Sequence, residues 1–223
     1  LDQNGLTENT LVIFSSDNGP EKQKTNVVTE DGKFMQAHSY APMVNTGYSR
    51  YASVGSNGGL RGHKRSLYEG GVRVPFIVRW PAQTPAGQVN ETTVINAVDL
   101  LPTFCEIAGV DLPEGYEPDG ESIYAALRGE NLQRTKPILW NWTGPAQGDW
   151  WPRWAIRDGD WKLVMDNEGD RVELYHLPDD PDESNNLIGE HPQLAERLQL
   201  QIRDWEQTLP KNPSPNTISA LRD

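Results

Sequence analysis

The first half of the chain contains two short apolar runs, each bounded by small, polar or proline residues. The first, LVIFSS, begins at Leu11, and the second, VPFIVRW, covers Val74–Trp80. Apolar and polar residues do not alternate cleanly in either run, which is typical of strands that are covered on both faces. The pattern therefore predicts buried strands over Thr10–Ser15 and Val74–Trp80, with a turn over Leu6–Asn9 before the first.

A helical pattern follows in the sequence AVDLLPTFCEIAGV. Its apolar residues recur at the spacing of one helix face. The predicted buried face consists of Val98, Leu101, Cys105 and Ala108. Pro102 is compatible with a helix only in the first turn, and Gly109 is a typical C-terminal stop. A second, short helix is predicted over Ser122–Leu127.

From about residue 134 the pattern changes to four strand-like runs, KPILWNW, RWAIRDG, DWKLVMD and RVELYHL. The pair Asp158-Gly159 between the middle two is typical of a hairpin turn. A closing helix is predicted over Leu187–Leu209, with Pro192 in its first turn. The buried stripe of this helix is expected to contain Leu194, Leu198, Ile202, Trp205 and Leu209.

These elements predict two parts. Residues 1–133 read as an α/β portion, and residues 134–223 as a small α+β domain in which an antiparallel four-stranded sheet packs on one helix. Between the first two strands, Glu21–Asn57 is polar and irregular. A stretch of this length without secondary structure usually carries function or is disordered.

Composition and charge exclude several classes of protein. The chain has 223 residues and a net charge of −12, which disfavours a general polyanion binder, so no nucleic-acid partner is expected. No apolar run approaches the ~18 residues that a membrane span needs, and no charged-then-apolar leader is visible. The single cysteine, Cys105, excludes an internal disulfide and reads as a small core residue.

Two oxygen-bearing side chains, Asp17 and Asn18, directly follow the first predicted strand. Ligands of open α/β sheets gather beyond the carboxyl ends of the strands. Carboxylate and amide oxygens suit a hard cation such as Ca²⁺ or Mg²⁺. The alternative is an ordinary turn, because the sequence Asp-Asn-Gly-Pro also has the residues that turns prefer.

A cluster of positive charge lies in the Gly-rich sequence LRGHKRSLYEGG, which contains Arg61, His63, Lys64 and Arg65. Such a loop could bind an anionic group, with the lysine as a compact point charge. The alternative is a solvated surface loop. His63 is a candidate acid or base, or only a neighbour of the lysine. An ion pair between Glu69 and Arg73 could shape the loop.

Two further features have a structural and a functional interpretation. Trp150 and Trp151 could form a stacking platform for a sugar or aryl ring, or could simply pack within the hairpins. The acidic run Asp179–Ser184 is expected to be a solvated turn.

Five segments in the same order resemble the sulfatases of the alkaline-phosphatase superfamily. They are ENTLVIFSSDNG, LRGHKRSLYEGGVRVPFIVRWP, VDLLPTFCEIAGV, DGESIYAALRG, and the C-terminal pair RDGDWKLV and ELYHLPDDPDESNNL. The resemblance implies the C-terminal part of an alkaline-phosphatase-like mixed sheet between helices, followed by the small domain. It also implies a sulfuric ester hydrolase.

The resemblance assigns roles to individual residues. It implies that Asp17 and Asn18 ligate an active-site Ca²⁺, that Asp17 lies beside the catalytic nucleophile, and that Lys64 contacts the sulfate. His63 and Arg61 are the further substrate-binding candidates; His63 stands where the family usually has glycine. The nucleophile of the family is a formylglycine made within Cys/Ser-x-Pro-x-Arg. No such motif occurs in these 223 residues.

The expected partners are therefore a sulfated small molecule or glycan and the N-terminal half of a sulfatase, which would carry the formylglycine and the other Ca²⁺ ligands. A periplasmic or extracellular location is implied by the family alone. Two alternatives stay open: a phosphoester or phosphonate hydrolase of the same superfamily, and a non-catalytic glycan-binding remnant.

Overall fold

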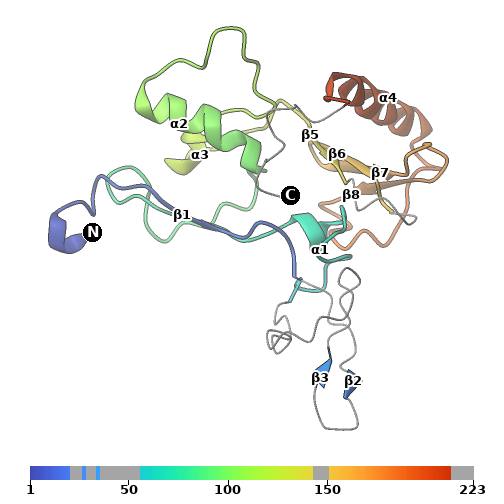
Figure 1. The fold of residues 1–223 in the computed structure, drawn as a ribbon, viewed down its shortest axis with the longest axis horizontal. Coiled ribbons are helices and arrows are strands. Elements are labelled where there is room, and N and C mark those ends of the chain that lie inside the picture. Colours follow the sequence, from blue (N-terminus) through green and yellow to red (C-terminus); the bar gives the residue numbers. More distant parts are fainter. Residues whose placement is uncertain (21–26, 29–33, 36–55, 143–150, 212–223) are drawn as a thin grey trace, which may run out of the picture.

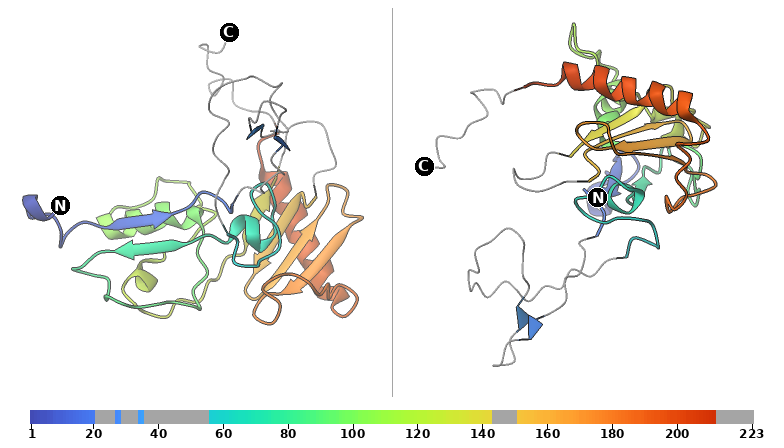
Figure 2. Two further views of the ribbon diagram at one scale, coloured as in Figure 1. Left: turned by 90° about the horizontal axis from the view of Figure 1, so that it is seen from below. Right: turned by 90° about the vertical axis from the view of Figure 1, so that its right-hand side faces the viewer.

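The structure is a computed structural model that describes residues 1–20, 27–28, 34–35, 56–142 and 151–211. Strands β1 and β4 form a narrow ribbon near helices α2 and α3, and a separate sheet, β5 to β8, packs on helix α4 (Figure 1). Helix α1 (Glu69–Val72) lies between the two parts (Figure 2). Most of the polar stretch Glu21–Asn57 lies outside the described residues, which include β2 (Val27–Val28) and β3 (Phe34–Met35), an antiparallel pair.

The first two predicted strands exist, but neither is covered on both faces by the described residues. Strand β1 (Val12–Ser15) pairs antiparallel with β4 (Phe76–Arg79), and Phe14 lies opposite Ile77. These two side chains are 63% and 59% exposed. The described residues therefore leave one face of the ribbon open, and the predicted cover on both faces would have to come from outside this part of the chain.

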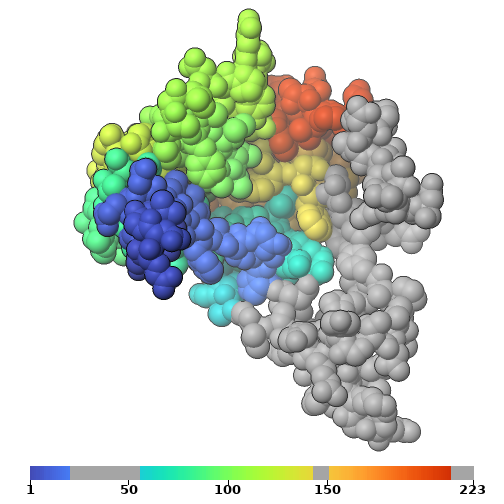
Figure 3. All heavy atoms as spheres, turned by 60° about the vertical axis from the view of Figure 1, so that its left-hand side comes forward, coloured from blue at the N-terminus to red at the C-terminus, as the bar shows by residue number. Residues whose placement is uncertain are grey.

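Helix α2 (Leu100–Ala108) follows a 3-10 turn, η2 (Ala97–Asp99), and ends at Gly109 with φ 65°, as predicted. Its buried side is not the predicted one. Val98 and Leu101 are 41% and 47% exposed, whereas Pro102 and Thr103 are buried. The segments that contain β1 and α2 lie on the surface (Figure 3, blue and green).

The polar anchoring of α2 explains which side is buried. The Thr103 hydroxyl accepts a hydrogen bond from the amide of Ile123, just before α3 (Tyr124–Leu127). Asp99 is fully buried and forms an ion pair with Arg134 at 2.6 Å. Because these contacts attach the Asp99–Thr103 side to the rest of the chain, the apolar stripe of α2 faces outward.

The predicted C-terminal sheet is confirmed. Strands β5 (Ile138–Asn141), β6 (Trp154–Asp158), β7 (Trp161–Met165) and β8 (Val172–His176) form an antiparallel meander in sequence order. Asp158 pairs with Trp161 across the predicted hairpin turn, in which Gly159 has φ 59°. Helix α4 (Pro192–Thr208) begins at the predicted proline, five residues later than the predicted start.

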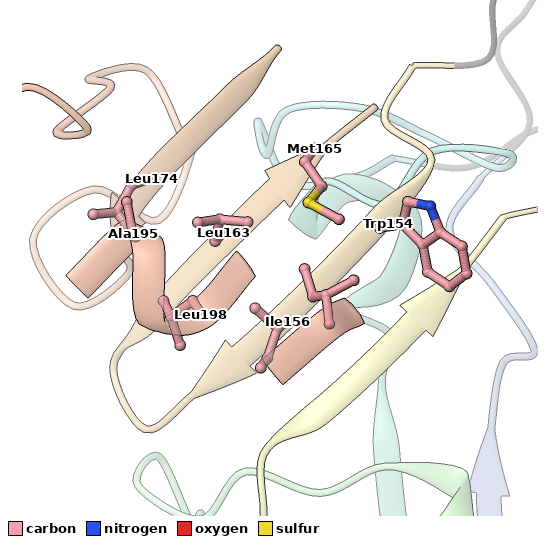
Figure 4. Packing of buried hydrophobic residues seen from close by; sticks show 8 residues of the cluster. Trp154, Ile156, Leu163, Met165, Leu174, Ala195 and Leu198 are labelled. Carbon is pink, nitrogen blue, oxygen red and sulfur yellow. The ribbon is translucent and has the colours of Figure 1, made fainter. Parts of the chain in front are cut away.

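One face of this sheet packs on α4. The side chains of Trp154, Ile156, Leu163, Met165 and Leu174 meet those of Ala195, Leu198 and Ile202, and all eight are buried. Figure 4 shows this cluster between the strands and the helix. Burying each such leucine or isoleucine contributes about 1.5–3 kcal/mol. The predicted stripe of α4 is thus its core-facing side.

The opposite face of the sheet is also covered, which the sequence pattern did not predict. Leu67 and Tyr68 pack against Ala155, Val164 and Tyr175 to form a second buried cluster. Residues from the first part of the chain therefore belong to the core of the C-terminal sheet. The division at residue 133 stays a prediction, but the segment around residues 61–72 is physically attached to the second part.

Candidate active site

The turn that follows β1 carries the two predicted metal ligands. Asp17 is exposed and Asn18 is half-buried. The Ser16 hydroxyl donates to the carbonyl of Asn18 at 2.9 Å, and the Asn18 amide group donates to the carbonyl of Gly19 at 2.9 Å. Asp17 has no hydrogen bond or ion pair with another described residue.

Backbone hydrogen bonds join this turn to the Gly-rich segment, residues 61–71, which we call the lysine loop. The amide of Gly19 donates to the carbonyl of Gly71 at 2.8 Å, and the amide of Lys64 donates to the carbonyl of Pro20 at 2.8 Å. A side chain at Gly19 would collide with the carbonyl of Gly70. The fold thus brings Asp17, Asn18 and Lys64 together, although they are far apart in sequence.

The lysine loop is a tight structure whose glycines are required. The amide of Gly70 donates to the carbonyl of Arg61 at 2.7 Å, and the amide of Ser66 donates to the carbonyl of His63 at 2.9 Å. A Cβ at Gly70 would meet the carbonyl oxygens of Arg61 and Gly62 at 2.5 Å. These two backbone segments of the loop can approach so closely only because glycine has no side chain.

The cationic residues of the loop have different environments. Lys64 is half-buried, and its ammonium group forms no hydrogen bond or ion pair with any other described residue. The Nδ1 atom of His63 lies 2.8 Å from the Lys64 carbonyl oxygen. The guanidinium of Arg61 lies 3.8 Å from the centre of the Tyr68 ring. Lys64 thus differs from Arg61, whose guanidinium is held by other described side chains.

Arg61 instead bonds to the C-terminal part of the chain. Its Nη1 atom donates to the Tyr175 hydroxyl at 2.7 Å and to the Glu183 carbonyl at 2.9 Å, and pairs with Glu173 at 3.2 Å. The Tyr68 hydroxyl donates to the same Glu173 oxygen at 2.5 Å. Arg61 thus anchors the lysine loop, and its role as a substrate-binding residue stays a prediction.

A second anchor of the loop was missed by sequence reasoning. Lys162, the second residue of β7, lies 2.8 Å from Glu69 and 3.0 Å from Glu183, and all three side chains are buried. Glu69 therefore pairs with Lys162 and not, as was expected, with Arg73. Glu183 corrects the interpretation of the acidic run, because it is 0% exposed while its acidic neighbours Asp179 and Asp182 face solvent.

The pKa of the Glu183 carboxyl reflects its burial. Loss of solvation raises this pKa, although the charge of Lys162 and the amide of Glu69 act in the opposite direction. The signal for this buried cluster in the sequence is weak: one lysine within an apolar strand, DWKLVMD. Period-2 alternation places that lysine on the face of the sheet opposite α4.

The donor set after β1 fits a hard cation but is incomplete. Asp17 and Asn18 offer at most about three side-chain oxygens, whereas Ca²⁺ takes roughly 6–8 oxygen ligands. Within the described ranges, no three His, Cys, Asp or Glu side chains come close enough together to hold a metal ion. Asp17 and Asn18 could therefore supply part of a Ca²⁺ site.

Comparison with protein-family models identifies the class of protein to which this chain belongs. Residues 61–208 match the family model for the C-terminal part of N-sulphoglucosamine sulphohydrolase, and residues 1–110 match the sulfatase family model. The chain belongs to the sulfatase family. The resemblance inferred from its motifs is confirmed.

Curated relatives agree over most of the chain. It is 34% identical to a sulfatase of Formosa agariphila over 97% of its own length and 36% of that protein's length. It is 30% identical to the N-acetylgalactosamine-6-O-sulfatase of Bacteroides thetaiotaomicron, over 89% of the chain and 36% of the relative. The chain thus spans about a third of the length of these two relatives.

Solved structures confirm the fold class. A sulfatase from the glycosaminoglycan locus of Bacteroides thetaiotaomicron matches with a TM-score of 0.63 and 26% identity, over 93% of this chain and 41% of that one. The crystal structure of Ps i-CgsB matches with a TM-score of 0.67 and 26% identity, over 92% and 38%. In the part of this chain that the structure describes, no helix is long and apolar enough to span a membrane.

Proposed function

We propose that this chain supplies part of the active site of a sulfatase that hydrolyses sulfate esters of carbohydrates. The observation that carries the proposal is the pair of backbone hydrogen bonds, Gly19 to Gly71 and Lys64 to Pro20, each 2.8 Å long. They join the turn with Asp17 and Asn18 to the loop with Lys64. A candidate metal-binding turn and a candidate anion-binding lysine thereby share one site.

Asp17 and Asn18 are proposed to hold a Ca²⁺ ion together with ligands from outside this chain. When bound, the ion supplies positive charge next to the sulfate oxygens. Lys64 adds a second positive charge, which attracts the sulfate and stabilises the charge that develops in the transition state. His63, whose Nδ1 atom lies 2.8 Å from the Lys64 carbonyl oxygen, is proposed to contact the sulfate as well.

The nucleophile is proposed to come from the N-terminal half of a sulfatase. The sequence contains no Cys/Ser-x-Pro-x-Arg motif in which a formylglycine could form. The apolar surface of Phe14 and Ile77, 63% and 59% exposed, is a suitable place for further sheet and helix to pack. The family resemblance also supports a periplasmic or extracellular location.

The substrate class is supported by relatives with at least 30% identity. Their names include N-acetylgalactosamine-6-O-sulfatase at 30% identity and N-acetylglucosamine-6-O-sulfatase at 32%. The Ps i-CgsB structure in complex with k-i-k-neocarrahexaose matches at 25% identity and a TM-score of 0.65. A sulfated glycan is therefore the proposed substrate. The chain is also 32% identical to the human steryl-sulfatase over 64% of its length, so a steryl sulfate is the second substrate to test.

The test is sulfate release by the complete protein that contains this chain. We expect release from sulfated oligosaccharides, with Lys64→Ala and Asp17→Ala each lowering the rate about 100-fold because both act on transition-state charge. Lys211→Ala and Asp111→Ala, at exposed positions, are the matched controls and should keep full activity. Phosphate-ester cleavage without sulfate-ester cleavage would refute the proposal in favour of the phosphoester alternative.

A further inference from the structure

The lysine loop is clamped by a buried ion cluster from the C-terminal part of the chain. Lys162 Nζ lies 2.8 Å from Glu69 Oε1 and 3.0 Å from Glu183 Oε1. Glu183 Oε2 accepts a hydrogen bond from the Glu69 amide at 2.6 Å. The carbonyl of Glu183 also accepts from Arg61 at 2.9 Å. Both ends of the loop, at Arg61 and Glu69, are therefore attached to Glu183, which Lys162 holds in place.

One residue of the clamp and one residue of the lysine loop have a strained backbone conformation. Arg65 has φ 72° and Glu183 has φ 54°, and they are the two non-glycine residues with positive φ in the described part of the chain. Such conformations are unfavourable for residues with a side chain and persist where surrounding contacts enforce them. Arg65 directly follows Lys64, so the enforced conformation lies next to the lysine that is proposed to contact the sulfate.

We propose that Lys162 and Glu183 are positioning residues that fix the lysine loop, and with it Lys64, in the geometry that binds the sulfate. The identity of the bound anion rests on the proposed function, whereas the fixing of the loop does not. The C-terminal sheet is then a part of the active-site scaffold, because β7 and the segment after β8 supply the clamp.

The buried charges of the clamp depend on one another. The Glu183 Oε1 atom has no polar contact with a described residue other than the Lys162 ammonium, 3.0 Å away, so this ammonium balances its charge. The second cation, Arg157, lies farther from the cluster, 3.8 Å from Glu69. A buried ion pair can often be replaced by apolar groups without loss of stability. Stability and positioning can therefore be separated by removing both charges together.

The first experiment is hydrogen exchange on the 223-residue chain with the double substitution Lys162→Met and Glu183→Gln. Glu69 keeps Arg157 as its partner in this variant. We expect a melting temperature close to that of the unsubstituted chain, but exchange about tenfold faster at the amides of Ser66 and Gly70. Lys211→Met with Glu190→Gln, both exposed, is the matched control and should change neither quantity.

Two outcomes of this experiment would overturn the proposal, and a further variant, Lys162→Arg, can support it. Unchanged exchange at Ser66 and Gly70 would overturn it, because the loop would then hold its shape without the clamp. A melting temperature lowered as strongly as by Lys162→Met alone would also overturn it and leave Lys162 and Glu183 with a purely stabilising role. Lys162→Arg keeps the charge, so exchange at the original rates in this variant would support the proposal.

The second experiment is a double-mutant cycle in the complete protein with a sulfated oligosaccharide. If Lys162 and Glu183 act through Lys64, their double substitution should lower kcat about tenfold in the original background and have no further effect in a Lys64→Ala background. Equal effects in both backgrounds would overturn positioning. Absence of any sulfate-ester turnover would refute the proposed function instead, and the exchange experiment would still decide whether the clamp fixes the loop.

Discussion

At the scale of single residues, the site depends on how closely two backbone segments approach. Gly19 and Gly70 meet with no room for a side chain, and the hydrogen bond between Gly19 and Gly71 is 2.8 Å long. Asn18, one residue before this contact, and Lys64, in the facing loop, are placed by it. The relative position of these two residues thus depends on glycines that carry no functional side chain.

Gly19→Ala tests this contact. We expect the added methyl group to push the turn away from the lysine loop, so that the Lys64 amide exchanges faster than in the unsubstituted chain. Gly189→Ala is the matched control, since Gly189 has no atom within 4 Å of an added Cβ and no positive φ. Equal exchange at Lys64 in both variants would contradict the close approach.

Glu173 provides a pH-dependent test of the loop's attachment. Burial alone would raise its pKa, but hydrogen bonds from Tyr175 and Tyr68 and the charge of Arg61 lower it overall. Because the folded-state pKa lies below the unfolded one, the stabilisation is present above about pH 4.5 and is lost as the pH falls through the folded value.

Glu173→Gln should accordingly lower the free energy of unfolding by about 1–2 kcal/mol at pH 7, with a smaller difference below about pH 4. Urea unfolding followed by tryptophan fluorescence measures this, since six of the eight tryptophans lie between Trp140 and Trp161. Glu190→Gln, at an exposed position, is the control. A difference that is the same at both pH values would contradict the assigned contacts.

At the scale of elements, the two sheets differ in how much of their surface is covered. The strands β6 to β8 are covered by α4 on one face and by residues of the lysine loop on the other. The ribbon of β1 and β4 leaves Phe14 and Ile77 exposed. Exposed apolar strands are sites of association, and their hydrogen bonds open easily.

Hydrogen exchange should separate the two sheets in the isolated chain. We expect slow exchange at the amides of Ile156, Leu163 and Leu174 and in the lysine loop, and fast exchange at Ile13 and Val78. Uniformly slow exchange across both sheets in a monomer would contradict this, because the ribbon would then be stabilised by the chain itself.

At the scale of the whole molecule, the site is proposed to be completed from outside the chain. The sequence provides Asp17, Asn18 and Lys64 but no motif for the nucleophile. The chain also spans only 36% of the length of its Formosa agariphila relative.

The isolated chain should not hydrolyse sulfate esters, because a partial metal site and a lysine cannot replace a nucleophile. The measurement is release of an aryl or sugar sulfate by the purified chain. Turnover that is abolished by Asp17→Ala and kept by Asp111→Ala would contradict the prediction and require a nucleophile within these residues.

Ca²⁺ should bind the isolated chain weakly, because about three side-chain oxygens are far fewer than the roughly 6–8 that the ion prefers. Titration calorimetry with and without Asp17→Ala measures this. Tight binding that depends on Asp17 would mean that further ligands lie within the chain, whereas tight binding in the complete protein alone would support the proposed division of ligands.

The sequence by itself determined the elements whose signals are local. The hairpin turn at Gly159, the proline start of α4 and the glycine end of α2 need only the preferences of single residues. The four strands of the meander follow from four separate strand-like runs. The family motifs likewise depend on residue order alone. Asp17 and Lys64 could be selected as candidates for this reason.

The tertiary structure alone decided which faces are covered and which charges are buried. The period of a pattern gives the apolar face of an element but not its neighbour, so the apolar stripe of α2 was wrongly predicted to be buried. Lys162 and Glu183 look like surface residues in sequence, yet both are 0% exposed because residues 61–71 fold back over the sheet. That contact joins residues about a hundred positions apart, and no local pattern encodes it.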